Sequence, residues 1–161
     1  MTDFLDALVS GAAVEVVGLT DAWTGHGEFF AADAVLVGER CPTGEGVFPA
    51  STRSGSWLRE ALVKLGARVV LANLHVPRDD RQAAAEPEYR LNADLLALLR
   101  HRETGPVVAL GRDVAAELAR QGILHYAVPH PAWHRRFRRA EGPAGYAAHL
   151  AAALEIPAPV Q

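Results

Sequence analysis

Apolar residues occur along this chain in short blocks separated by longer stretches of mixed polarity. Four blocks are rich in valine, leucine and isoleucine and end at glycine or proline, which is typical of buried strands. They cover residues 34–38, 67–77, 106–111 and 123–131. Residues 11–19 also fit a strand, and a polar stretch broken by glycines follows them.

Between these blocks, apolar residues return every three or four positions, which predicts helices. The segment SWLREALVKLG (56–66) is the clearest case, because Gly66 provides a stop after a continuous apolar face. That face is formed by Trp57, Leu58, Ala61, Leu62 and Leu65. Helices are also predicted over residues 2–10, 81–102, 112–122 and 143–155.

Strands that alternate with helices predict an α/β fold with right-handed crossovers. We expect a mainly parallel central sheet of about four strands, covered by helices on both faces in a three-layer α/β/α arrangement. The sequence contains no repeat, low-complexity tract or interdomain linker. Residues 1–161 are therefore expected to form a single domain.

The composition favours a compact intracellular protein. The chain has 161 residues, of which 50 % are hydrophobic and 22 % charged, enough to bury a core without disulfides or metal. Its single cysteine excludes an internal disulfide or a four-cysteine iron–sulfur cluster. The first residues carry acids where a signal peptide carries bases, and no apolar run reaches the roughly 18 residues of a membrane span. We therefore expect a cytoplasmic location and no membrane partner.

Polar residues gather where the predicted strands end. Ligands of open parallel sheets bind at the carboxyl ends of the strands, so these residues should meet at one edge. They are Glu39 to Phe48 after the first strand, Asn73 and His75 near the end of the second, Gly111 to Asp113 after the third and His130 after the fourth.

The loop GERCPTGEG (38–46) lacks the lysine of a phosphate-binding P-loop and the glycine spacing of a dinucleotide fingerprint. An ordinary connecting loop remains open, as does a reactive thiol at Cys41, whose pKa a neighbouring arginine would lower. Asn73 in LANLH suits the reading of a base edge, although an asparagine that only stabilises a turn has the same pattern.

The segment VPHPAWHRRFRR (128–139) interleaves aromatic and basic residues after a histidine that lies between two prolines. Aromatic faces stack on bases and arginines bind phosphates, so this pattern favours nucleic-acid contact. A helix with a solvated arginine face would look the same. The formal net charge of −3 is not that of a strongly basic nucleic-acid binder.

Taken together, the segments VGERCP, GVFPAS, SWLREALVKLG, LANLHVPR, ALGRDVA and PHPAWHRR resemble the uracil-DNA glycosylase superfamily in content and order. The resemblance is closest to the iron–sulfur bacterial branch and covers about residues 34–139. It implies a DNA glycosylase that flips uracil or a modified pyrimidine out of DNA and hydrolyses its N-glycosidic bond with water, as a step of DNA repair. DNA, single- or double-stranded, is the implied partner, and no cofactor or metal is implied.

The resemblance also assigns roles to individual residues. Glu39 matches the acid that positions or activates water, and His130 the histidine that stabilises negative charge on the departing base. Phe48 matches the stacking aromatic and Asn73 the amide that reads the base edge. Contacts to the DNA backbone are expected from Ser54, Ser56, Trp133, Arg135 and Arg136.

The sequence departs from the family pattern at several points. Cys41 alone cannot hold the cluster of the iron–sulfur branch. Arg40 and Cys41 replace a small residue and a proline, so we expect this pair to line the base pocket and to influence substrate choice. Phe48 precedes its proline instead of following it, and HPAW replaces HPS. Two alternatives remain: a catalytically silent protein of the same fold that binds nucleic acid or a partner, and an α/β enzyme acting on free nucleosides or nucleotides.

Overall fold

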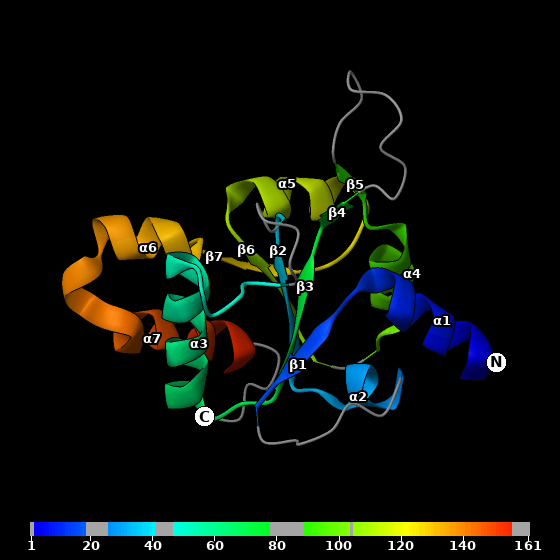
Figure 1. Ribbon diagram of the computed structural model, residues 1–161, viewed down its shortest axis with the longest axis horizontal. Coiled ribbons are helices and arrows are strands. Elements are labelled where there is room, and N and C mark those ends of the chain that lie inside the picture. Colours follow the sequence, from blue (N-terminus) through cyan, green and yellow to red (C-terminus); the bar gives the residue numbers. More distant parts are fainter. Residues whose placement is uncertain (1, 19–25, 41–46, 78–88, 104, 156–161) are drawn as a thin grey trace.

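The computed structural model describes residues 2–18, 26–40, 47–77, 89–103 and 105–155 (Figure 1). Its main sheet has five strands in the order β1-β3-β2-β6-β7. The strands are β1 (Glu15–Val17), β2 (Ala34–Gly38), β3 (Val69–Asn73), β6 (Val107–Leu110) and β7 (Tyr126–Val128). β3, β2, β6 and β7 are mutually parallel, and β1 joins one edge antiparallel to β3.

Helices cover both faces of this sheet (Figure 1). They are α1 (Thr2–Ala12), α2 (His26–Ala31), α3 (Arg53–Leu65), α4 (Ala93–His101), α5 (Arg112–Arg120), α6 (Pro131–Phe137) and α7 (Gly142–Glu155), with a short 3-10 turn η1 (Arg139–Glu141) between the last two. The predicted α/β class, with a mainly parallel sheet between helical layers, is confirmed in this described part.

Strand alternation divides the core in two, because successive side chains of a strand point to opposite faces. On β2, Val35 and Val37 pack against α1, α2, α4 and α5, whereas Ala34 and Leu36 pack against α3 and α7. The neighbouring strands β3 and β6 divide in the same way. Each strand of the parallel centre is therefore apolar on both sides, which explains why these strands are continuous apolar runs in the sequence.

The predicted strand over residues 67–77 is wrong in extent, because the chain changes partners after Asn73. The Leu74 N–H donates to the Gly38 carbonyl and the Leu74 carbonyl accepts from the Asn92 N–H. The chain then leaves the main sheet, and β4 (His75–Pro77) pairs antiparallel with β5 (Tyr89–Leu91).

The predicted helix over 81–102 is wrong at its start. Residues 89–91 form β5, and the helix begins only after Asn92, whose side chain caps α4 by accepting from the Leu95 N–H. The remaining residues of that prediction, 81–88, lie outside the described residues.

One further prediction, at the N-terminal end, is corrected. Within residues 11–18, α1 continues to Ala12 and only Glu15–Val17 form a strand, whereas residue 19 lies outside the described residues. The glycine-broken stretch after it contains α2, because the fully buried Phe29 anchors this short helix in the core. Among the helices that the structure describes, none has the length and apolar character to cross a bilayer.

Candidate active site

A pocket opens at the carboxyl ends of β2, β6 and β7. The chain leaves β2 towards β3 on one side of the sheet and leaves β6 towards β7 on the other, so the two outgoing loops separate. Such a switch in strand order is where α/β sheets bind ligands. The pocket has a volume of about 830 Å³, and Glu39, Gly111, Asp113, His130 and Trp133 contribute to its lining. The two proposed catalytic residues, Glu39 and His130, therefore face the same cavity.

His130 is fixed in one orientation at the start of α6. It is the N-cap residue, and its Nδ1 accepts a hydrogen bond from the Ala132 backbone N–H at 3.0 Å. A backbone N–H only donates, so Nδ1 carries the lone pair and a neutral ring has its hydrogen on Nε2. In the described part of the chain Nε2 has no hydrogen-bond partner. His130 can therefore donate from Nε2 to an acceptor in the pocket.

The surroundings of His130 favour this neutral form. Burial lowers the pKa of His130 below its ordinary value, and the charge of the nearby Glu39 carboxylate only partly opposes this effect. Gly111, at φ 109°, packs against the histidine, and a Cβ there would lie 3.3 Å from the His130 Cβ. Tyr146 donates its hydroxyl hydrogen to the carbonyl of the preceding Pro129 at 2.6 Å. Burial raises the pKa of Tyr146, so this donor stays protonated.

Glu39 directly follows β2 and its backbone is held in place. The Glu39 carbonyl accepts from the N–H of His75, the first residue of β4, at 2.8 Å, just beyond the paired ends of β2 and β3. The half-buried carboxylate remains at the wall of the pocket. A carboxylate that accepts protons and an imidazole that donates from Nε2 thus share one cavity, which suits attack by water on a bond whose leaving group becomes negative.

Phe48 lies beside His130, with ring centroids 5.8 Å apart at an angle of 45°. The ring also lies directly over Gly38, where an added Cβ would be 2.3 Å from a Phe48 ring carbon. Glycine at the end of β2 is therefore needed for this close approach. Phe48 is only 8 % exposed, so its ring belongs to the core that α3 and α7 cover.

The backbone of Phe48 is strained and clamped. Its φ of 44° lies in the left-handed region, which costs a non-glycine residue roughly 1–3 kcal/mol. Arg59 from α3 offsets this strain by donating to the Phe48 carbonyl at 2.8 Å and to the Val47 carbonyl at 2.9 Å. The same guanidinium pairs with Glu15 of β1 at 2.7 Å. Strand β1 and helix α3 together hold the Phe48 turn.

Asn73 ends β3 directly opposite Gly38, one strand away from Glu39. It is 7 % exposed, and its carbonyl accepts from the Asn92 side chain at 2.8 Å. The Asn92 amide also donates to the Ala12 carbonyl at 2.9 Å, so this buried side chain ties α1 to the end of β3. Asn73 thus lies at the predicted edge of the sheet, while its role in reading a base stays a prediction.

The pair expected to influence substrate choice is only partly described. The Arg40 guanidinium lies over the Tyr89 ring of β5, 5.1 Å from its centroid, which is a cation–π distance. Cys41 lies outside the described residues. Arg40 therefore connects the loop after β2 with the small β4-β5 sheet.

The residues expected at a DNA backbone lie on α3 and α6. Trp133, 45 % exposed, packs against the exposed Phe137 at 5.4 Å, and the Arg136 guanidinium lies 5.3 Å from the Phe137 centroid. Ser56 and Arg135 line a separate hollow of about 330 Å³ at the start of α3. Ser54 is half-buried in the first turn of that helix.

The roles of several residues that hold the site in place were not predicted from the sequence. Arg59 and Asn92 donate to the carbonyls of Phe48 and Asn73, and Tyr146 donates to the carbonyl of Pro129, which precedes His130. The sequence pattern places His134 in a basic run, where an exposed side chain is expected, but the side chain is fully buried. The sequence shows only that Arg59 and Tyr146 lie in predicted helices, and this does not identify a hydrogen-bond partner far away in the sequence.

Comparison of the chain with protein-family models, with curated proteins and with solved structures found no match.

Proposed function

We propose that this protein is a DNA glycosylase-like enzyme of the uracil-DNA glycosylase superfamily, which hydrolyses the N-glycosidic bond of uracil or a modified pyrimidine in DNA. The observation that carries the proposal is that Glu39 and His130 line one pocket at the switch in strand order. Phe48 beside His130, and Asn73 on the neighbouring strand, add to it.

The proposed reaction assigns each group a step. The bond between the sugar C1′ and the base nitrogen breaks, and its electron pair leaves with the base. His130 donates a hydrogen bond from Nε2 to the base oxygen on which negative charge develops, as an oxyanion donor does. Glu39 positions water for attack on the positively charged sugar carbon and accepts its proton. The base must first leave the duplex to enter a pocket of this kind.

A second candidate is a catalytically silent protein of the same fold that binds nucleic acid or a protein partner. The burial of Phe48 favours it, because a ring that is 8 % exposed offers little face to a stacked base. The exposed Trp133 and Phe137 with Arg136 would serve such binding without the pocket.

One assay tests both candidates. The protein is incubated with single- and double-stranded oligonucleotides that carry uracil, hydroxymethyluracil or other modified pyrimidines, and abasic sites are then cleaved with alkali. We expect strand breaks that Glu39→Gln and His130→Gln each reduce by about 100-fold or more. Leu124→Ser, at an exposed position before the start of β7 and so at the end of that strand opposite the pocket, is the matched control and should leave the rate unchanged.

The other outcomes each select an alternative. Salt-sensitive DNA binding without product on any base would support the silent binder. The absence of both DNA binding and excision would exclude the glycosylase and a silent nucleic-acid binder, and would favour an enzyme that acts on free nucleosides or nucleotides.

A further inference from the structure

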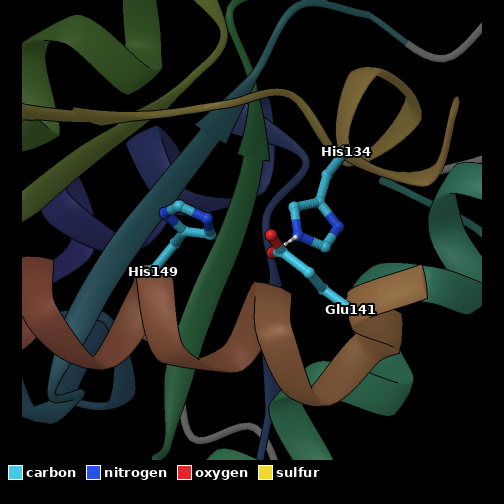
Figure 2. Close-up of side chains that lie close together, drawn as sticks. All are labelled: His134, Glu141 and His149. Carbon is cyan, nitrogen blue, oxygen red and sulfur yellow. Dashed lines mark hydrogen bonds and ion pairs between the residues drawn. The ribbon is translucent and has the colours of Figure 1, made fainter. Parts of the chain in front are cut away.

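A second histidine, His134, lies one turn after His130 in α6 and is completely buried. Its Nδ1 accepts from the indole Nε1–H of Trp57 in α3 at 3.1 Å. Its Nε2 lies 3.0 Å from a Glu141 carboxylate oxygen in η1, and Figure 2 shows this contact as a dashed line. The imidazole thus connects three elements, α3, α6 and η1.

His134, Glu141 and His149 together have the composition of a metal site, with ligand atoms that all lie within 4.8 Å of one another. Figure 2 shows the Glu141 carboxylate between the two rings. However, the Trp57 indole can only donate, so Nδ1 of His134 must hold the lone pair and Nε2 the hydrogen. A metal bound at Nε2 would require the opposite tautomer and would leave Nδ1–H facing the indole N–H. The hydrogen bonds therefore oppose metal binding.

The same hydrogen bonds fix the position of α6. This helix is only seven residues long, and its two buried side chains are Pro131 and His134. The His134 N–H donates to the His130 carbonyl at 3.0 Å, so one helical turn connects the two histidines directly. The His134 ring also packs edge-on against Tyr146, at 5.1 Å between centroids. Tyr146 in turn holds the Pro129 carbonyl next to His130.

We infer that His134, held by Trp57 and Glu141, is a positioning residue that sets the place and orientation of His130 in the pocket. This inference rests on the proposed function only in so far as His130 acts on the substrate. A short helix with an apolar contact alone could rotate about its axis. Two hydrogen bonds on opposite nitrogens of the buried His134 ring define the orientation of this ring and of α6. The position of His130, the N-cap residue of α6, is thereby fixed as well.

The test compares variants of the full chain. Trp57→Phe removes the donor and keeps a flat ring in the same half-buried place. His134→Gln keeps one acceptor for Trp57 and one donor for Glu141, whereas His134→Leu removes both. His149→Ala is the matched control, since His149 has only ring contacts in the described part of the chain.

Two readouts are measured. The first is the single-turnover rate of uracil excision with the Kd for DNA determined separately. The second is the set of ¹⁵N shifts of the His130 ring, which report its tautomer and are assigned with His130→Gln. We expect Trp57→Phe and His134→Leu to slow excision by about 10- to 100-fold at unchanged Kd. The ¹⁵N signals of the His130 ring should shift, because the ring moves in the pocket, while the local cap from the Ala132 N–H keeps the Nε2–H tautomer. His134→Gln should restore both readouts, and His149→Ala should leave them unchanged.

The inference is overturned if Trp57→Phe leaves the His130 ring signals and the excision rate as they are in the unsubstituted protein. It is also overturned if His134→Gln behaves like His134→Leu, because the ring would then matter only for packing. If the unsubstituted protein excises no base, the proposed function fails, and the ring signals of His130 still decide the inference by themselves.

A titration with Zn²⁺ tests whether His134 binds metal. We expect the ¹⁵N shifts of His134 to stay constant at one equivalent of metal. A saturating change in these shifts that His149→Ala abolishes would show the opposite tautomer and would overturn the inference.

Discussion

His130 and His134 share one kind of hydrogen bond but differ in what the other ring nitrogen can do. In each ring Nδ1 accepts from a group that can only donate, the Ala132 backbone N–H in one case and the Trp57 indole in the other. Each donor therefore selects the neutral Nε2–H tautomer. Glu141 takes up that hydrogen in His134, whereas in His130 it is left to the pocket. Of these two histidines, four residues apart, His134 therefore holds the structure and His130 is the candidate catalytic group.

The pKa of His130 leads to a prediction about stability and pH. Burial lowers this pKa in the folded protein below about 6.5, the value in an unfolded chain. The unfolded chain therefore takes up the proton first as the pH falls. The contribution of His130 to stability is present above about pH 6.5 and is lost as the pH falls towards the folded pKa. Urea unfolding at a series of pH values should show this loss, and His130→Gln should remove it.

An NMR titration of the same ring provides the independent check. We expect its midpoint below about 6.5, and lower still in Glu39→Gln, because the carboxylate raises the pKa of His130. A midpoint at or above 6.5 in the unsubstituted protein would contradict the prediction.

At the scale of elements, the turn around Phe48 depends on contacts from outside the loop. The left-handed Phe48 is held by Arg59 from α3, which is itself paired with Glu15 from β1. The Thr52 hydroxyl donates to the Pro49 carbonyl at 2.8 Å and accepts from the Gly55 N–H at 3.0 Å, so it caps α3 and closes the turn at once. The helix start and the aromatic turn therefore form one unit.

Arg59→Met tests this unit, because it keeps the apolar stem of the side chain and removes both donors to the turn. Hydrogen bonds from a charged group are worth about 1.5–3 kcal/mol each, so we expect the loss of the two bonds to lower the free energy of unfolding by about 3–6 kcal/mol. Urea denaturation measures this loss. Glu15→Gln removes only a partly exposed ion pair and should cost less than about 1 kcal/mol. Equal losses in both variants would contradict the conclusion that the contacts of Arg59 with the two carbonyls hold the turn.

At the scale of the whole molecule, the parallel centre of the fold was predictable because its side chains are apolar on both faces. Val35 and Leu36 illustrate this, since they face opposite cores and give an unbroken apolar run. The meeting of Glu39 and His130 followed from the rule that strand ends share one edge. The roles of these residues were carried by family resemblance and stay predictions.

What the sequence did not predict depends on partners far along the chain. β1 and β5 are three residues each and exist through pairing with β3 and β4, which local pattern cannot reveal. The bond between Trp57 and His134 spans 77 positions. The sequence pattern places Trp57 on an apolar helix face, and the partner of its indole N–H is supplied by α6, which packs beside α3.

Because the net charge of the whole molecule is −3, DNA binding by this protein requires local basic contacts. Arg135 and Arg136 are the proposed phosphate contacts, and they lie on α6, the helix that His130 caps. Replacing both by alanine should weaken DNA binding and reduce the slope of log K against log salt by about 1–2, since each phosphate contact contributes about 0.7–0.9. Lys64→Ala with Arg120→Ala removes the same charge at the C-terminal ends of α3 and α5, away from the pocket. Fluorescence anisotropy with labelled DNA measures both slopes. An equal change in the two double variants would mean that net charge, and not a phosphate site on α6, governs binding.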